Sequence, residues 1–119
     1  MPIPMTRAEF EEAVGDAFDS IPQELLDRLE NVAITVEDEP PADGPQNLLG
    51  LYVGVPLTQR GEGYGLGNLP DHIYIFRGPL TRYCGSRPQL LEQIRVTVLH
   101  EIGHYFGIDD ARLHELGWG

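Results

Sequence analysis

The chain has 119 residues, and its 19 acidic side chains outnumber its 8 arginines, for a formal net charge of −11. This length predicts a single domain over residues 1–119 with an apolar core of its own. Because an acidic chain repels phosphate groups, neither nucleic acid nor an anionic membrane is an expected partner. A single cysteine (Cys84), no long apolar run and no signal-peptide pattern indicate the reducing cytoplasm.

Two helices are predicted before the first strand. Residues 6–9 fit a capping box, with Met5 and Phe10 placed as a hydrophobic staple, and open a helix that runs to about residue 18. Residues 20–23 fit a second capping box and open a short helix through about residue 29.

Three strands are predicted in the middle of the chain, over residues 32–36, 48–55 and 72–76. The third alternates isoleucines with aromatic residues, as a half-buried strand does. Prolines and glycines mark residues 37–47 and 56–70 as loops between these strands.

The longest predicted helix covers about residues 87–106 and opens with a capping box at 86–89. Gly107 is placed to end it, and Asp109 or Asp110 can cap a last short helix through about residue 116. The apolar residues expected to face the core from the long helix are Leu91, Ile94, Val98 and Ile102.

An H-E-x-x-H sequence, His100 to His104, lies inside the long helix. Residues four apart share one helix face, so both imidazoles can reach one Zn²⁺ ion at about 2.0–2.1 Å. Glu101 lies about 100° further round the helix, where it can reach water at the metal. We therefore expect Glu101 to act as general base and then as proton donor to a leaving amine.

A catalytic zinc needs a third protein ligand. Gly107 can turn the chain back sharply, and Asp110 follows three residues later, which completes the pattern H-E-x-x-H-x-x-G-x-x-D. Asp110 has a second interpretation as a helix N-cap. The other candidates for the third ligand are Asp109, His114, Glu115, His72 and Cys84.

The segment from His100 to Asp110 resembles the extended zinc signature of metzincin-type metallopeptidases, with Asp110 in the place of their third histidine. The chain as a whole more closely resembles the small bacterial zincin-like metallopeptidases, often described as minimal metalloproteases. This wider resemblance rests on EDEPP at 37–41, LLGLYVGVPLT at 48–58, LPDHIYIFRGPL at 69–80 and VLHEIGHYFGIDDARLHELGW at 98–118.

The resemblance implies an α+β, zincin-like domain. We expect a small, mostly antiparallel or mixed sheet of about three strands, packed with the active-site helix and two N-terminal helices. The resemblance also implies a zinc ion on His100 and His104, Asp110 as the third ligand and Glu101 as the catalytic acid/base.

Two further expectations concern the substrate. In zincins an extended substrate lies beside an edge strand, and residues 72–76 are our candidate for that edge. Tyr64, in the glycine-rich loop, is a candidate for stabilising the oxyanion.

One feature departs from the metzincin pattern. Metzincins have a methionine turn downstream of the signature, whereas the only methionines here are Met1 and Met5. Only nine residues follow Asp110, so we expect either a shallow cleft or a partner that completes it.

The predicted function is that of a zinc-dependent metallopeptidase acting on peptides or proteins, as a monomer or weak oligomer. One alternative is a zinc-stabilised binding or interaction module without turnover. Another is an interaction protein whose residues 1–48, with 12 acids and two arginines, bind a basic partner. Glu101 favours the enzyme, because a structural zinc site has no need of a carboxylate beside it.

Overall fold

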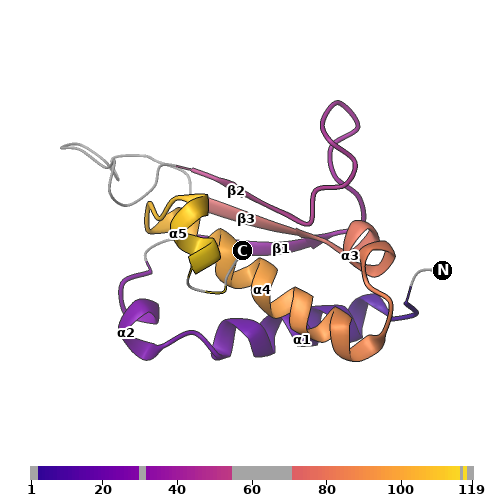
Figure 1. Cartoon of the computed structure of the whole chain (residues 1–119), viewed down its shortest axis with the longest axis horizontal. Helices are drawn as coiled ribbons and strands as arrows, with labels where there is room; N and C mark the ends of the chain where they lie inside the picture. The colour runs from indigo at the N-terminus through magenta and orange to yellow at the C-terminus, as the bar shows by residue number, and fades with distance from the viewer. Residues whose placement is uncertain (1–2, 30–31, 55–70, 116, 118–119) are drawn as a thin grey trace.

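The computed structural model describes residues 3–29, 32–54, 71–115 and 117 (Figure 1). This part of the chain forms five helices and three strands, which confirms the predicted α+β class. In chain order they are α1 (Arg7–Asp19), α2 (Gln23–Leu26), β1 (Val32–Glu37), β2 (Gly50–Val53), β3 (Asp71–Phe76), α3 (Arg77–Tyr83), α4 (Arg87–Tyr105) and α5 (Asp110–Glu115).

The three strands form one mixed sheet in the order β1-β3-β2. β1 runs parallel to β3, and β2 runs antiparallel to it, with Ile34 and Tyr52 both opposite Ile73. The prediction that residues 72–76 form the edge is therefore wrong. β3 is bonded on both sides and its isoleucines, Ile73 and Ile75, are fully buried, as befits a central strand. Among the strands that the structure describes, β1 and β2 lie at the two edges of the sheet.

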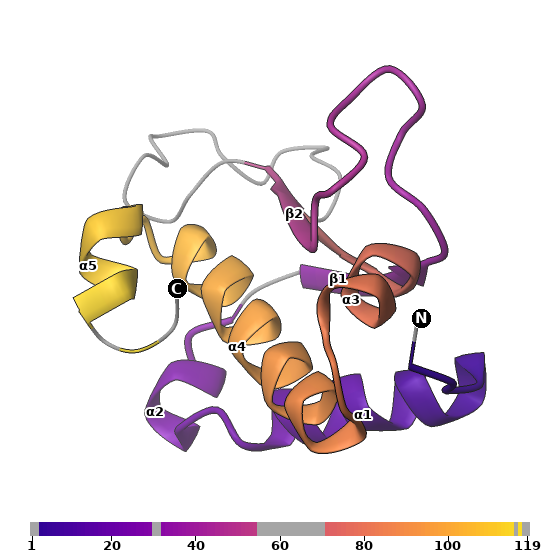
Figure 2. The same ribbon diagram turned by 45° about the vertical axis from the view of Figure 1, so that its right-hand side comes forward.

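α1 and α4 lie on the same side of the sheet and enclose the core (Figures 1 and 2). α4 packs against α1 and passes beneath β2 and β3. The residues that fill this space include Phe10, Val14, Ala17, Ile73, Ile75, Leu90, Ile94, Val98 and Ile102.

Leu91 does not face the core as predicted, since it is 43% exposed and Leu90 is buried instead. The buried row of α4 advances by four residues from Leu90 through Ile94, and Leu91 lies about 100° away from Leu90 around the helix.

The predicted capping boxes have different outcomes. Thr6 and Glu9 form both reciprocal bonds of the box at the start of α1. Ser86 caps α4 by accepting a bond from the Gln89 N–H, but the Gln89 side chain accepts from Gly85, so the reciprocal half is missing.

The predicted box at residues 20–23 is wrong. Ser20 is the C-cap of α1, and its hydroxyl donates to the Ala17 carbonyl at 2.6 Å. α2 begins only after Pro22, which caps it without a side-chain hydrogen bond, and it ends at Leu26 rather than at about residue 29.

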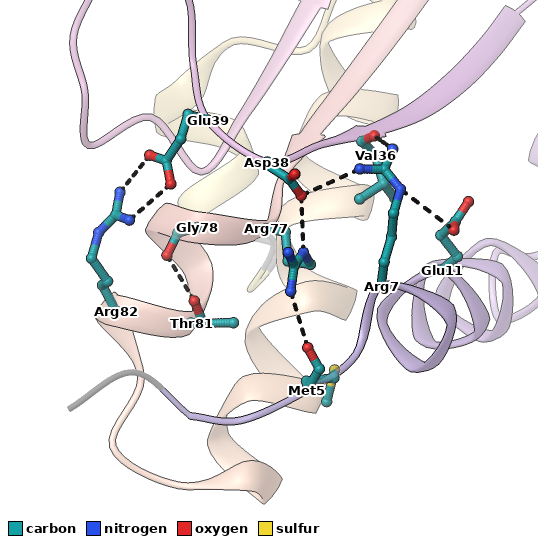
Figure 3. Close-up of polar contacts among 10 residues, drawn as sticks. All are labelled: Met5, Arg7, Glu11, Val36, Asp38, Glu39, Arg77, Gly78, Thr81 and Arg82. Carbon is teal, nitrogen blue, oxygen red and sulfur yellow. Dashed lines mark hydrogen bonds and ion pairs between the residues drawn. The ribbon is translucent and has the colours of Figure 1, made fainter.

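α3, which contains Gly78 and Pro79, was not predicted. Proline is compatible with a first helical turn, and acidic residues after β1 hold the helix in place. Arg82 makes a bidentate ion pair with Glu39 at 2.8 and 2.9 Å (Figure 3). Through this ion pair, the EDEPP segment at the end of β1 holds α3 in place.

Among the residues that the structure describes, no helix has both the length and the apolar character that crossing a membrane requires.

Candidate metal centre

The C-terminal half of α4 gathers the side chains of the H-E-x-x-H sequence. Ligand atoms of His100, Glu101 and His104 all lie within 4.8 Å of one another. Both histidines lie away from the fully buried row of α4 and are therefore only partly buried. Their ring centroids are 4.5 Å apart. The predicted shared face is therefore confirmed.

The turn after α4 brings Asp110 to this cluster. Gly107 has φ 78°, a conformation that favours glycine, and its N–H donates to the His104 carbonyl at 3.0 Å. The N–H of Ile108 donates to the Gly103 carbonyl at 3.0 Å, which completes a Schellman motif. α5 then starts at Asp110 and is anchored by Leu113, which is fully buried.

One carboxylate oxygen of Asp110 faces both imidazoles. Its Oδ1 lies 2.9 Å from Nε2 of His104 and 3.4 Å from Nε2 of His100. Two ligands on one tetrahedral zinc, each at about 2.0–2.1 Å, have donor atoms separated by about 3.3 Å. The chemistry of these three donors, and the distances from Asp110 to the two imidazole nitrogens, therefore fit a zinc ion.

The hydrogen bonds of His104 favour positive charge at this ring. Its Nδ1 lies 3.0 Å from Oε1 of Glu101, while its Nε2 faces Asp110. A neutral imidazole carries one N–H, so two carboxylate contacts require a second proton or a metal ion. Burial works to lower the pKa of His104, but the hydrogen bond to Asp110 and the charge of Glu101 outweigh it and raise that pKa. The same bond lowers the pKa of Asp110.

Glu101 is buried, with 5% of its surface exposed, at the wall of a cavity of about 240 Å³. Burial raises the pKa of its carboxyl, against the lowering effect of the two imidazoles. The cavity lies between β2 and α4 and is lined by Leu49, Gly50, Gln93, Val96, Thr97, His100 and Glu101. A carboxyl group with a raised pKa thus borders a space that a small group can enter.

The neighbouring carboxylate, Asp109, has a different role. Its Oδ1 accepts a hydrogen bond from the backbone N–H of Arg112 at 2.8 Å, so Asp109 is the N-cap of α5. The capping role that the sequence left open between Asp109 and Asp110 therefore belongs to Asp109.

The other candidates for the third ligand have different surroundings. His72 lies on the sheet, 2.7 Å from the Thr35 hydroxyl, and Cys84 is buried in the core. Glu115 pairs with Arg112 at 2.9 Å. His114 is exposed on α5, and Tyr64 lies outside the described residues.

Gly50 is a site residue that the sequence interpretation missed. It lines the cavity, and its backbone runs against Thr97 and Glu101. A signal was present, because an isolated glycine within a predicted strand often marks a close backbone approach.

Comparisons with known proteins identify a family and a similar fold. A family model described as zincin-like metallopeptidase matches residues 29–118. A solved structure, a conserved hypothetical protein from T. thermophilus, superimposes with a TM-score of 0.57 and 22% identity, over 94% of this chain and 97% of that one. At this identity the likeness shows the fold alone. No curated protein matches the chain. Since the family model covers most of the sequence, including the histidine cluster, this protein belongs to the zincin-like metallopeptidase family.

Proposed function

We propose that the protein is a zinc-dependent metallopeptidase that hydrolyses peptide bonds in peptides or proteins. The observation that carries this proposal is the convergence of His100, His104 and Asp110, with the buried carboxyl of Glu101 beside them. Membership of a metallopeptidase family supports it.

The proposed zinc ligands are Nε2 of His100, Nε2 of His104 and the carboxylate of Asp110. Three protein ligands are typical of catalytic zinc sites, whereas structural sites use four. Zinc, when bound, supplies Lewis acidity that activates water and polarises a carbonyl group.

Glu101 is the proposed general base and acid. Its carboxylate accepts a proton from the attacking water and returns it to the leaving amine. Its environment suits both steps, because burial raises its pKa toward the working pH and His104 holds one of its oxygens at 3.0 Å.

The proposed substrate is an extended chain that lies along β2. β2 is the edge strand nearest to α4, and an edge strand offers backbone groups that can pair with a peptide. The cavity between β2 and α4 is large enough for one side chain. Leu49 and Val96 in its lining favour an apolar one.

The experiment compares the wild type with Glu101→Gln on a broad peptide library, after the zinc content of both has been measured. We expect one zinc per chain in both proteins and a rate at least about 100-fold lower for the variant, the low end of what a general acid/base contributes. Equal cleavage by both would reject Glu101 as the acid/base. Zinc in both proteins with no cleavage by either would identify a zinc-stabilised binding module instead.

A further inference from the structure

The backbone of β2 comes unusually close to α4 at Gly50. A Cβ atom built on this residue would lie 2.8 Å from Cγ2 of Thr97, 3.1 Å from Cγ of Glu101 and 3.3 Å from Oε2 of Glu101. Carbon atoms in favourable contact are about 3.5–4.0 Å apart. Any side chain at position 50 therefore has to displace a neighbour.

The strand itself is not free to move away. Gly50 is paired with Ile75 of the central strand, and the Leu49 carbonyl accepts a hydrogen bond from Phe76 at 2.9 Å. Thr97 is 4% exposed and, being branched at Cβ, has few alternative rotamers. A displacement therefore falls on Glu101 as well as on Thr97.

The hydrogen bond of Glu101 fixes the direction of that displacement. Its Oε1 faces Nδ1 of His104 at 3.0 Å, while its Oε2 faces Gly50. The carboxyl group thus lies between an imidazole on one side and bare backbone on the other. A methyl group at position 50 shifts the carboxyl group and changes its contact with His104.

We propose that Gly50 is a positioning residue for Glu101. Its lack of a side chain lets β2 form a close wall that holds the carboxyl group against His104, beside the cavity. This inference rests on the proposed function for its effect on catalysis, whereas its effect on the position of Glu101 can be measured in the metal-free protein.

The test uses Gly50→Ala, Gly50→Ala with Thr97→Ser, and Thr97→Ser alone. Serine at 97 lacks the methyl group that a Cβ at position 50 would meet at 2.8 Å, but it leaves both Glu101 contacts in place. Gly15→Ala is the matched control, because a Cβ there meets nothing within 4 Å. For each variant we measure thermal stability, zinc affinity, kcat and KM, and the NMR signals of the Glu101 side chain without metal.

We expect Gly50→Ala to retain zinc affinity within about threefold, to lose kcat at least tenfold with little change in KM, and to shift the Glu101 carboxyl signal. Gly50→Ala should also lower the melting temperature, because its Cβ crowds Thr97. The double variant should regain that thermal stability but should recover neither kcat nor the original Glu101 signal. Gly15→Ala should match the wild type in zinc affinity, kcat, KM and the Glu101 signal, and should be no less stable, because alanine is favoured over glycine inside α1. Thr97→Ser alone should keep the wild-type Glu101 signal. In the wild type, nuclear Overhauser contacts should join the Gly50 Hα and Glu101 Hγ protons.

Recovery of kcat in the double variant would overturn the proposal, because the damage would then come from crowding at Thr97. Absence of the Gly50–Glu101 contact in the wild type, or an unshifted Glu101 signal in Gly50→Ala, would also overturn it. If the wild type cleaves nothing, the proposed function fails, and the Glu101 signal of the metal-free protein still decides the role of Gly50.

Discussion

The two adjacent carboxylates that follow α4, Asp109 and Asp110, have different roles. Asp109 caps α5 through the Arg112 N–H, whereas Asp110 faces both imidazoles. The sequence could predict that one residue of the pair caps and the other turns to the histidines. It favoured Asp110 as the ligand but left the cap open between the two residues, because the cap depends on the residue at which α5 begins, and helix starts are uncertain by one or two positions.

Replacing each carboxylate in turn separates these tasks. Asp110→Ala should lower zinc affinity by more than the roughly 10–100-fold that loss of an outer contact costs, because a ligand is removed. Asp109→Ala should cost about 1 kcal/mol of α5 stability and therefore at most about fivefold in zinc affinity. Titration of zinc against a competing chelator measures both. A larger loss for Asp109→Ala would contradict the assignment.

The element that delivers Asp110 is α5, and its anchor is a contact with α4. A Cβ on Gly103 would run into the side chain of Leu113, so the two helices approach as closely as glycine allows. The fourth position of H-E-x-x-H, directly before His104, is thus used to dock the helix that carries Asp110.

Disturbing this anchor should weaken zinc binding without touching a ligand. Gly103→Ala and Leu113→Ala should each lower zinc affinity roughly tenfold, as outer-shell changes do. The double variant should lose no more than one single variant, because the added methyl group then enters the vacated space. Leu91→Ala, at an exposed position of α4, is the control. Additive losses would show that the two residues act independently.

Among the helices and turns, the sequence predicted α4, its Ser86 cap, the Gly107 turn and α5, because the residue patterns that indicate them are local. The edge position of residues 72–76 was predicted wrongly, since a strand's neighbours depend on crossovers far apart in the chain. α3 was missed for a similar reason: its ion pairs come from residues about 40 positions earlier.

Over the whole molecule, acidic residues of the N-terminal half pair with three arginines of the C-terminal half and with Arg7. Arg77 and Arg7 both reach Asp38, at 3.1 and 3.2 Å, and connect α3 and α1 to the end of β1 (Figure 3). Glu39 and Glu9 hold Arg82 and Arg87 in the same way. Part of the acidic excess therefore has internal partners, which weakens the case for a basic protein partner.

These exposed ion pairs should contribute far less to stability than the core. Asp38→Ala should lower the free energy of unfolding by about 1 kcal/mol, and by less at high salt. Ile94→Ala should lower it by about 2–5 kcal/mol, because Ile94 is fully buried between the helices and the sheet. Urea denaturation at two salt concentrations measures both. Equal losses would contradict this ranking.

The central claim is that His100, His104 and Asp110 hold one zinc ion. X-ray absorption at the zinc edge, on protein loaded with one equivalent, tests it most directly. The account predicts two imidazole nitrogens at about 2.0–2.1 Å and at least one oxygen at about 2.0–2.2 Å, with one nitrogen lost in His104→Ala. A zinc environment that includes sulfur, or one that His104→Ala leaves unchanged, would contradict it.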